Sequence, residues 1–115
     1  MAVEVILDIY SGRENPKWRL APPEIHELQQ KLNGIWKKKT DHLPDPPGLG
    51  YRGFHLSARE ENMPKHMTVF EGVVQTESGN FQDPDRGIEK WLMQKSKGHV
   101  DKATYDYLVS LAEAK

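Results

Sequence analysis

The sequence contains no cysteine, and this one absence excludes several kinds of chemistry. Without a thiol the chain forms no disulfide bond, supplies no thiolate ligand to a metal and has no cysteine nucleophile. A long hydrophobic run is also missing, because no apolar stretch approaches the roughly 20 residues that a membrane-spanning helix requires. The sequence therefore predicts no membrane partner.

An excess of charge of one sign is absent as well. Lysine and arginine number 16 and aspartate and glutamate 17, which gives a formal net charge of −1 at pH 7. Proteins that bind the phosphates of nucleic acids usually carry a clear basic excess, so the composition argues against a nucleic-acid partner. The first ten residues lack the basic start and small-residue cleavage site of a signal peptide, and we expect a cytoplasmic location.

The length of 115 residues predicts a single domain, spanning 1–115. Hydrophobic residues make up 37% of the chain and include three tryptophans, four tyrosines and three phenylalanines. This supply of bulky apolar side chains is enough for one hydrophobic core and argues against global disorder.

Alternation of apolar and polar residues predicts four strands, at 3–10, 17–20, 51–57 and 67–76. The last of them, MTVFEGVVQT, has apolar residues on both faces, which is typical of a central strand.

Apolar residues at helical spacing predict three helices. One runs from about Pro23 to Asn33, one opens at Asp83-Pro84, and the last follows a cap at Asp101. Strands and helices are partly segregated along the chain. We therefore predict an α+β fold, with a small, mostly antiparallel sheet of about four strands and three helices packed on one face.

Two loops are the predicted binding elements, 11–17 (SGRENPK) and 36–50 (WKKKTDHLPDPPGLG). A guanidinium on an ordered loop can hold a carboxylate or phosphate with two parallel hydrogen bonds, and a basic patch beside an aromatic ring can hold phosphate. The candidate ligand-binding residues are Arg13, Asn15, Trp36 and Lys37. The alternative is structural: an arginine paired with Asp8, Glu14 or a carboxylate elsewhere, and solvated lysines.

Catalytic signatures are few. The chain has no G-x-S-x-G elbow, no P-loop and no HExxH motif. If the protein is an enzyme, the general acid–base candidates are His55, His66, Glu71 and Asp8. His55 and His66 lie on or beside neighbouring predicted strands, so they are also the candidates for a metal site completed by a nearby carboxylate. The alternative is that each is an ordinary surface or sheet-face histidine.

Three functions follow from these patterns. The preferred prediction is a small binding or protein-interaction module that uses no cofactor and presents loops 11–17 and 36–50 to a small anionic ligand or another protein. The second is a small cofactor-independent or metal-dependent enzyme that acts on a metabolite in a pocket between sheet and helices. The third is a structural subunit of a homo-oligomer, which would expose an apolar patch on the last helix.

Overall fold

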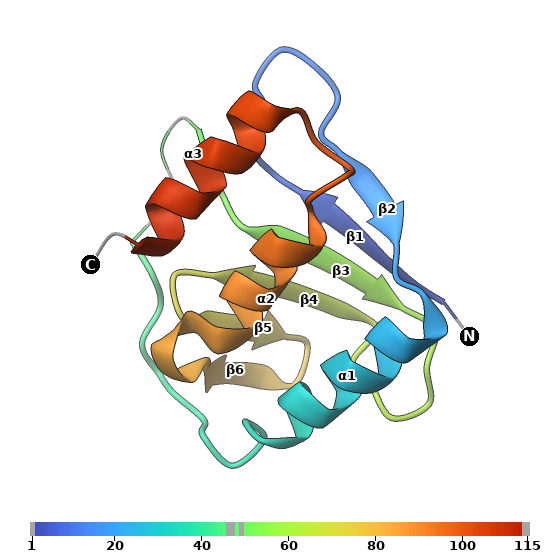
Figure 1. Ribbon diagram of the computed structural model, residues 1–115. Coiled ribbons are helices and arrows are strands. Elements are labelled where there is room, and N and C mark those ends of the chain that lie inside the picture. Colours follow the sequence, from blue (N-terminus) through green and yellow to red (C-terminus); the bar gives the residue numbers. More distant parts are fainter. Residues whose placement is uncertain (1, 46–47, 49, 114–115) are drawn as a thin grey trace.

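A computed structural model describes residues 2–45, 48 and 50–113, which form a six-stranded antiparallel sheet and three α-helices. All three helices lie on the same side of the sheet (Figure 1). The predicted α+β class is confirmed, whereas the prediction of about four strands is wrong. No helix of the described residues is long and apolar enough to cross a membrane.

The sheet has the strand order β2-β1-β3-β4-β5-β6, and every neighbouring pair is antiparallel. The strands are β1 (Val3–Leu7), β2 (Lys17–Arg19), β3 (Phe54–Ala58), β4 (His66–Phe70), β5 (Val73–Thr76) and β6 (Gly79–Gln82). Loop 11–17 joins the first two strands at one edge of the sheet, and β6 forms the other edge.

The helices are α1 (Pro22–Asn33), α2 (Gly87–Lys95) and α3 (Lys102–Glu113), and a short 3₁₀ helix, η1 (Pro84–Arg86), precedes α2. Proline in the first turn of α1 suits a position where the backbone N–H has no helical partner. The Glu24 carboxylate accepts a hydrogen bond from the N–H of Ala21 at 2.8 Å and so closes the start of the helix.

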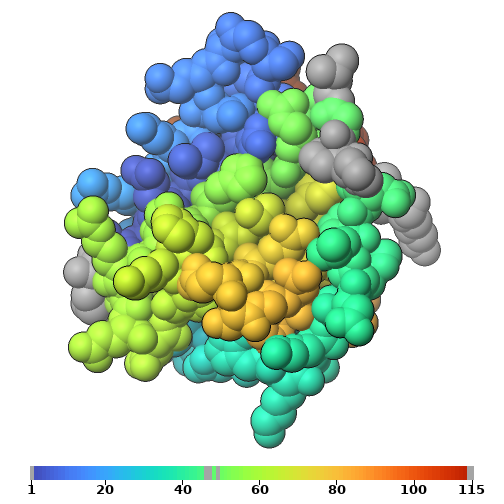
Figure 2. Space-filling model, turned by 180° about the vertical axis from the view of Figure 1, so that it is seen from behind, coloured from blue at the N-terminus to red at the C-terminus, as the bar shows by residue number. Residues whose placement is uncertain are grey.

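The core lies between the sheet and the helices. Alternation along β1 turns three fully buried side chains toward the helices: Val3, Val5 and Leu7. Each helix adds a fully or almost fully buried leucine to the same cluster: Leu28, Leu92 and Leu108. The other face of the sheet carries no helix, and Figure 2 shows it from behind. We call it the open face.

The predicted strand 67–76 is in fact a hairpin, which accounts for one of the two missing strands. The chain reverses at Glu71 and Gly72, whose φ angles are 46° and 81°. Two consecutive residues with positive φ are typical of the tight turn that joins paired strands. Glutamate is an unusual choice at such a position, and the turn is instead fastened by a distant residue. The backbone N–H groups of both turn residues donate to the carboxylate of Glu89, at 3.1 and 3.0 Å.

The predicted helix at Asp83-Pro84 begins later than expected. Asp85 and Arg86 both adopt left-handed φ angles, 55° and 56°, and the α-helix starts at Gly87. The Asp83 carboxylate still caps it, accepting hydrogen bonds from the N–H groups of Ile88 and Glu89 at 2.8 and 3.0 Å. Burial raises the pKa of Asp83 above its ordinary 3.8, and these two hydrogen bonds offset part of the rise.

Candidate functional site

Loop 11–17 is held in one shape by the side chain of Asn15. Its amide oxygen accepts hydrogen bonds from the backbone N–H groups of Ile9 and Tyr10, at 3.0 and 2.8 Å. Its amide nitrogen donates to the carboxylate of Asp8 at 3.3 Å. All of these partners belong to the chain itself, so this candidate ligand-binding residue acts as a brace inside the loop.

A second brace comes from Arg52, which lies just before β3. Its Nε donates to the Asp8 carboxylate at 2.9 Å, and its terminal nitrogen donates to the backbone carbonyl of Tyr10 at 2.7 Å. Burial alone would raise the pKa of Asp8, but hydrogen bonds from His55 and Arg52 and the Arg52 charge outweigh it, so the pKa lies below 3.8. The base of the loop is therefore a pre-formed, charged network.

Arg13 stands out because it takes no part in this network. Its guanidinium lies over the ring of Tyr10, 3.7 Å from the centroid, and the hydroxyl of that tyrosine forms a 2.7 Å hydrogen bond with Thr104 on α3. The carboxylate nearest to Arg13 is that of Asp101, at 3.9 Å, with both side chains about 60% exposed. Within the described residues Arg13 makes no hydrogen bond.

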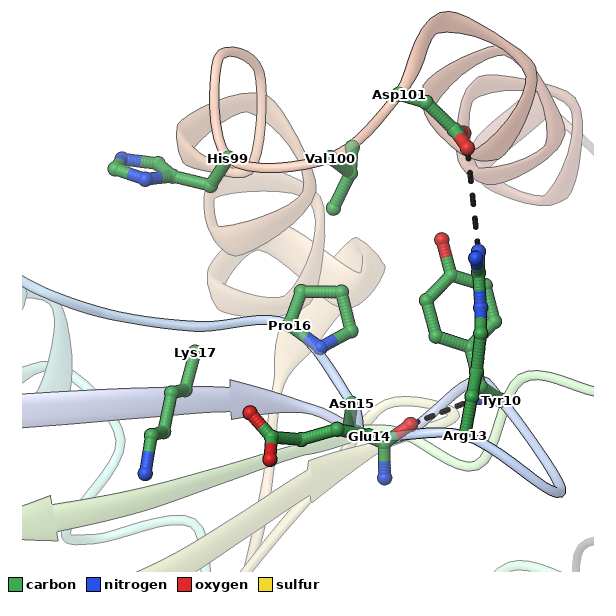
Figure 3. Close-up of a pocket in the computed structure, with 9 residues that line it drawn as sticks. All are labelled: Tyr10, Arg13, Glu14, Asn15, Pro16, Lys17, His99, Val100 and Asp101. Atoms are coloured by element: carbon green, nitrogen blue, oxygen red, sulfur yellow. Dashed lines mark hydrogen bonds and ion pairs between the residues drawn. The ribbon is translucent and has the colours of Figure 1, made fainter.

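Arg13 borders a surface hollow of about 910 Å³ between loop 11–17 and the connection from α2 to α3 (Figure 3). We call it the Arg13 hollow. Its lining is Tyr10, Arg13, Glu14, Asn15, Pro16, Lys17, His99, Val100 and Asp101. In Figure 3 Pro16 and Val100 face each other in the middle, with Arg13 and Asp101 on one side and His99 and Lys17 on the other. The His99 ring stacks on buried Trp18, with centroids 4.9 Å apart.

The other two predicted ligand residues lie elsewhere. Trp36 is half-buried and packs edge-on against Phe81 of β6, with ring centroids 5.0 Å apart, while Lys37 is exposed. The segment that follows them runs beside β6 and pairs with it through Lys39. Because β6 and the 11–17 loop are at opposite edges of the sheet, the four predicted residues do not form one site.

A second hollow, of about 800 Å³, lies beside the β3–β4 connection. Its charged lining residues are Glu4, Glu60 and Glu61 against Arg19, Arg59 and Lys65. Negative and positive groups are thus matched in number. The charges of the Arg13 hollow are also mixed, so what distinguishes it is the geometry of Arg13 rather than its net charge.

The open face brings together two of the predicted acid–base residues. His55 of β3 lies between Asp8 and Thr68, with Nε2 3.0 Å from the Asp8 carboxylate and Nδ1 3.2 Å from the Thr68 hydroxyl. The side chain of His55 is 44% exposed. A carboxylate thus lies within hydrogen-bond reach of a histidine, but on the open face rather than in a pocket between sheet and helices.

The other two acid–base candidates do not join this group. His66 lies on the same face, opposite Ser57 in the register, and is exposed. Glu71 occupies the β4–β5 turn, where its side chain is exposed and its backbone N–H is held by Glu89. Within the described residues no hydrogen bond or ion pair links either of them to His55.

No cluster of three metal-ligating side chains occurs among the residues that the structure describes. His55 and His66 were the candidates for such a site. Both ring nitrogens of His55 are engaged, by Asp8 and by Thr68. Large exposed apolar side chains in the described part of the chain are Leu43 and Tyr107, of which the second lies on α3.

Arg52, Thr68 and His99 are not among the residues that the sequence patterns predict to be functional. Like Arg13, Arg52 is an arginine among turn-forming residues. The same pattern could therefore have predicted it as a functional residue. Thr68 has no local signal, because its role depends on the register that sets it opposite His55. His99 also has no local signal, because its ring lies at the hollow by stacking on Trp18, which is distant in the sequence.

Comparisons with protein-family models, with curated proteins and with solved structures found no match to this chain. The fold and the site define an α+β protein with a braced loop beside a surface hollow and a second sheet face that carries no helix.

Proposed function

We propose that the protein is a small binding module that takes up a small anionic ligand in the Arg13 hollow. One observation carries the proposal. The Arg13 guanidinium lies over the Tyr10 ring, 3.7 Å from its centroid, and none of its N–H groups donates a hydrogen bond within the described residues. A planar guanidinium with free donors matches the oxygens of a carboxylate or phosphate.

The braced loop supports this proposal, because a site that is already ordered loses little conformational entropy on binding. Asn15 and Arg52 hold the loop from below, and Thr104 holds the hydroxyl end of Tyr10. The 3.9 Å contact with Asp101 is too long for a hydrogen bond and is exposed to solvent. A ligand oxygen can therefore take the edge of the guanidinium that Asp101 does not occupy.

The rest of the hollow suits a ligand with more than a charge. Pro16 and Val100 supply an apolar middle, and Lys17 and His99 stand on the far side from Arg13 (Figure 3). Small-molecule sites commonly combine an apolar lining with a few polar groups that set orientation. The geometry favours an anion that carries an apolar body over a bare inorganic ion.

The experiment is a titration of the ¹⁵N-labelled protein, followed by backbone and arginine Nε–H chemical shifts. Phosphate, acetate and a benzoate are the probes. We expect shifts confined to loop 11–17, residues 99–101 and the Arg13 side chain, strongest for the benzoate. Arg13→Ala should abolish them without unfolding the protein. Arg19→Ala removes an exposed arginine of β2 outside the hollow and should leave them intact.

Two results would contradict the proposal. The first is an absence of shifts in the wild type at millimolar concentrations of all three probes. The second is an equal response of the wild type and the Arg13→Ala variant, which would place the binding elsewhere.

A further inference from the structure

A second feature of the molecule lies outside the Arg13 hollow, on the open face. Three side chains from separate segments stand in line there: Asp8 after β1, His55 on β3 and Thr68 on β4. The distances are 3.0 Å from the carboxylate to Nε2 and 3.2 Å from Nδ1 to the hydroxyl. A carboxylate, an imidazole and a hydroxyl in this order are the parts of an activated nucleophile.

The surroundings assign a role to each atom in the line. Asp8 is kept as a carboxylate by Arg52, which donates to its other oxygen at 2.9 Å, and Asn15 donates to that oxygen as well, at 3.3 Å. An ionised carboxylate only accepts hydrogen bonds, so the Nε2 of His55 carries the proton between them. In the neutral ring Nδ1 is then unprotonated and accepts the hydrogen bond of the Thr68 hydroxyl.

The line is open to an incoming molecule. No helix lies over this face (Figure 2), and the His55 side chain is 44% exposed. The strand register places Gln75 directly opposite Thr68 on the same face. The Gln75 amide makes no hydrogen bond within the described residues. The Cβ atoms of directly opposite residues in a sheet are about 5 Å apart, so the Gln75 side chain lies close to Thr68. It is therefore placed to donate to an oxygen bound beside the hydroxyl.

We propose that Thr68, His55 and Asp8 form a nucleophilic site that accepts acyl groups from small activated esters. The Thr68 oxygen attacks the ester carbonyl carbon as its proton passes to Nδ1 of His55. The bond from that carbon to the alcohol oxygen breaks, and the alcohol leaves with the proton, so that an acyl-threonine remains. Water then attacks this ester with His55 again accepting the proton, and the carboxylic acid and the free hydroxyl are restored.

The test uses p-nitrophenyl acetate with the full chain. Release of p-nitrophenolate gives the rate, and mass spectrometry of peptides after a short reaction locates the acetyl group. We expect acetyl on Thr68 in the wild type. Thr68→Val and His55→Gln should each lower the protein-dependent rate by about 100-fold, the lower end of what a positioned general base contributes.

Two control variants make the result decisive. Ser57→Ala removes an exposed hydroxyl on the same face and strand as His55, and should leave the rate unchanged. Thr68→Ser keeps the hydroxyl and should retain activity, which separates loss of the nucleophile from loss of packing.

The proposal is overturned if Thr68→Val reacts as fast as the wild type, or if acetyl is found only on lysines or on His55. In that event the line of three side chains is a hydrogen-bonded surface network and nothing more. These outcomes do not decide anion binding by Arg13, because neither Thr68 nor His55 lines the Arg13 hollow.

Discussion

Two arginine–carboxylate pairs in this molecule occupy opposite environments. In the pair of Arg86 and Glu89 the atoms are 3.0 Å apart, and the glutamate side chain is fully buried. In the pair of Arg13 and Asp101 they are 3.9 Å apart, and both side chains are about 60% exposed. The same two chemical groups thus meet once inside the protein and once at its surface.

The buried pair is saturated with hydrogen bonds. Besides Arg86, the Glu89 carboxylate accepts from the Tyr51 hydroxyl at 2.5 Å and from the two N–H groups of the β4–β5 turn. Burial, together with the Glu89 charge, raises the pKa of Tyr51 above its ordinary 10.0, so its hydroxyl stays protonated as a donor. Arg86 also donates to the carbonyl of Leu111 near the end of α3. This cluster joins a turn, a loop and two helices.

The two pairs differ in whether their polar groups are satisfied within the protein or remain able to bind a ligand. A buried charge is tolerated only when its hydrogen bonds are satisfied, so the groups around Glu89 have nothing left for a ligand. Arg13 stacks on Tyr10 and makes only a long, exposed contact with Asp101, and within the described residues its side chain donates no hydrogen bond. Substitutions in the Glu89 cluster should therefore lower the stability of the protein, whereas substitution of Arg13 should weaken ligand binding.

The largest effect is expected from Glu89→Gln. The amide leaves the half-buried Arg86 guanidinium beside a buried group without charge. It also turns one acceptor into a donor, next to groups that are themselves donors. We expect a loss of about 3–5 kcal/mol in the free energy of unfolding, as for other broken buried pairs. Urea denaturation measures it. Asp106→Asn, in the exposed pair with Lys102, is the matched control and should leave the unfolding curve in place. A loss below about 1 kcal/mol for Glu89→Gln would break the comparison.

The next effect concerns the brace beneath Arg13. Asn15→Ala removes the acceptor of two backbone N–H groups and a donor to Asp8, and we expect it to cost about 2 kcal/mol. It should also weaken anion binding in the chemical-shift titration, because it loosens the loop that carries Arg13, although Asn15 itself is not proposed to contact the ligand. Asn33→Ala, at an exposed position at the end of α1, is the control. Unchanged stability and binding in Asn15→Ala would show that the loop is not held by this side chain.

A smaller, pH-dependent effect is expected from Asp8. Its pKa in the folded protein lies below 3.8, so its contribution to stability is present above the unfolded pKa and is lost as the pH falls through the folded pKa. The difference in unfolding free energy between wild type and Asp8→Asn should therefore shrink as the pH is lowered from 7 into the range below 3.8. Urea denaturation at several pH values measures it, and a difference that grows in acid would contradict the assignment.

The smallest effect on stability is expected from Arg13→Ala. We expect its Tm to stay within about 2 °C of the wild type, as for other exposed substitutions. Arg86→Ala changes the same residue type in the buried cluster and should lower the Tm far more. Thermal unfolding followed by circular dichroism compares them directly. A large drop for Arg13→Ala would make the guanidinium a structural group and remove it as the leading binding residue.

Much of the fold could be predicted from local patterns. The alternation of Val3, Val5 and Leu7, the proline start of α1 and the cap at Asp101 each act through neighbours in the chain, and each is present in the structure. Within the predicted strand 17–20, Trp18 and Leu20 alternate with charged residues, and both are buried. The hairpin within 67–76 escaped prediction because its turn is stabilised by Glu89 rather than by its own residues.

The candidate sites depended more on distant contacts. Loop 11–17 was recognisable from its turn residues and its arginine, but Trp36 and Lys37 proved to lie at the other edge of the sheet. The pairing of His55 with Thr68 required the strand register, which a single sequence does not specify.

The sequence by itself determined the α+β class, most of the elements and the presence of an arginine on a loop of turn-forming residues, because backbone preferences and periodic burial are local properties. Only the tertiary structure decided which partner each charged group has. It buried Glu89 among donors, set Asp8 beside His55 and left Arg13 next to Asp101 on one side of the Arg13 hollow. The physical reason is that an ion pair between distant residues depends on packing and register, and these form only when the whole chain folds.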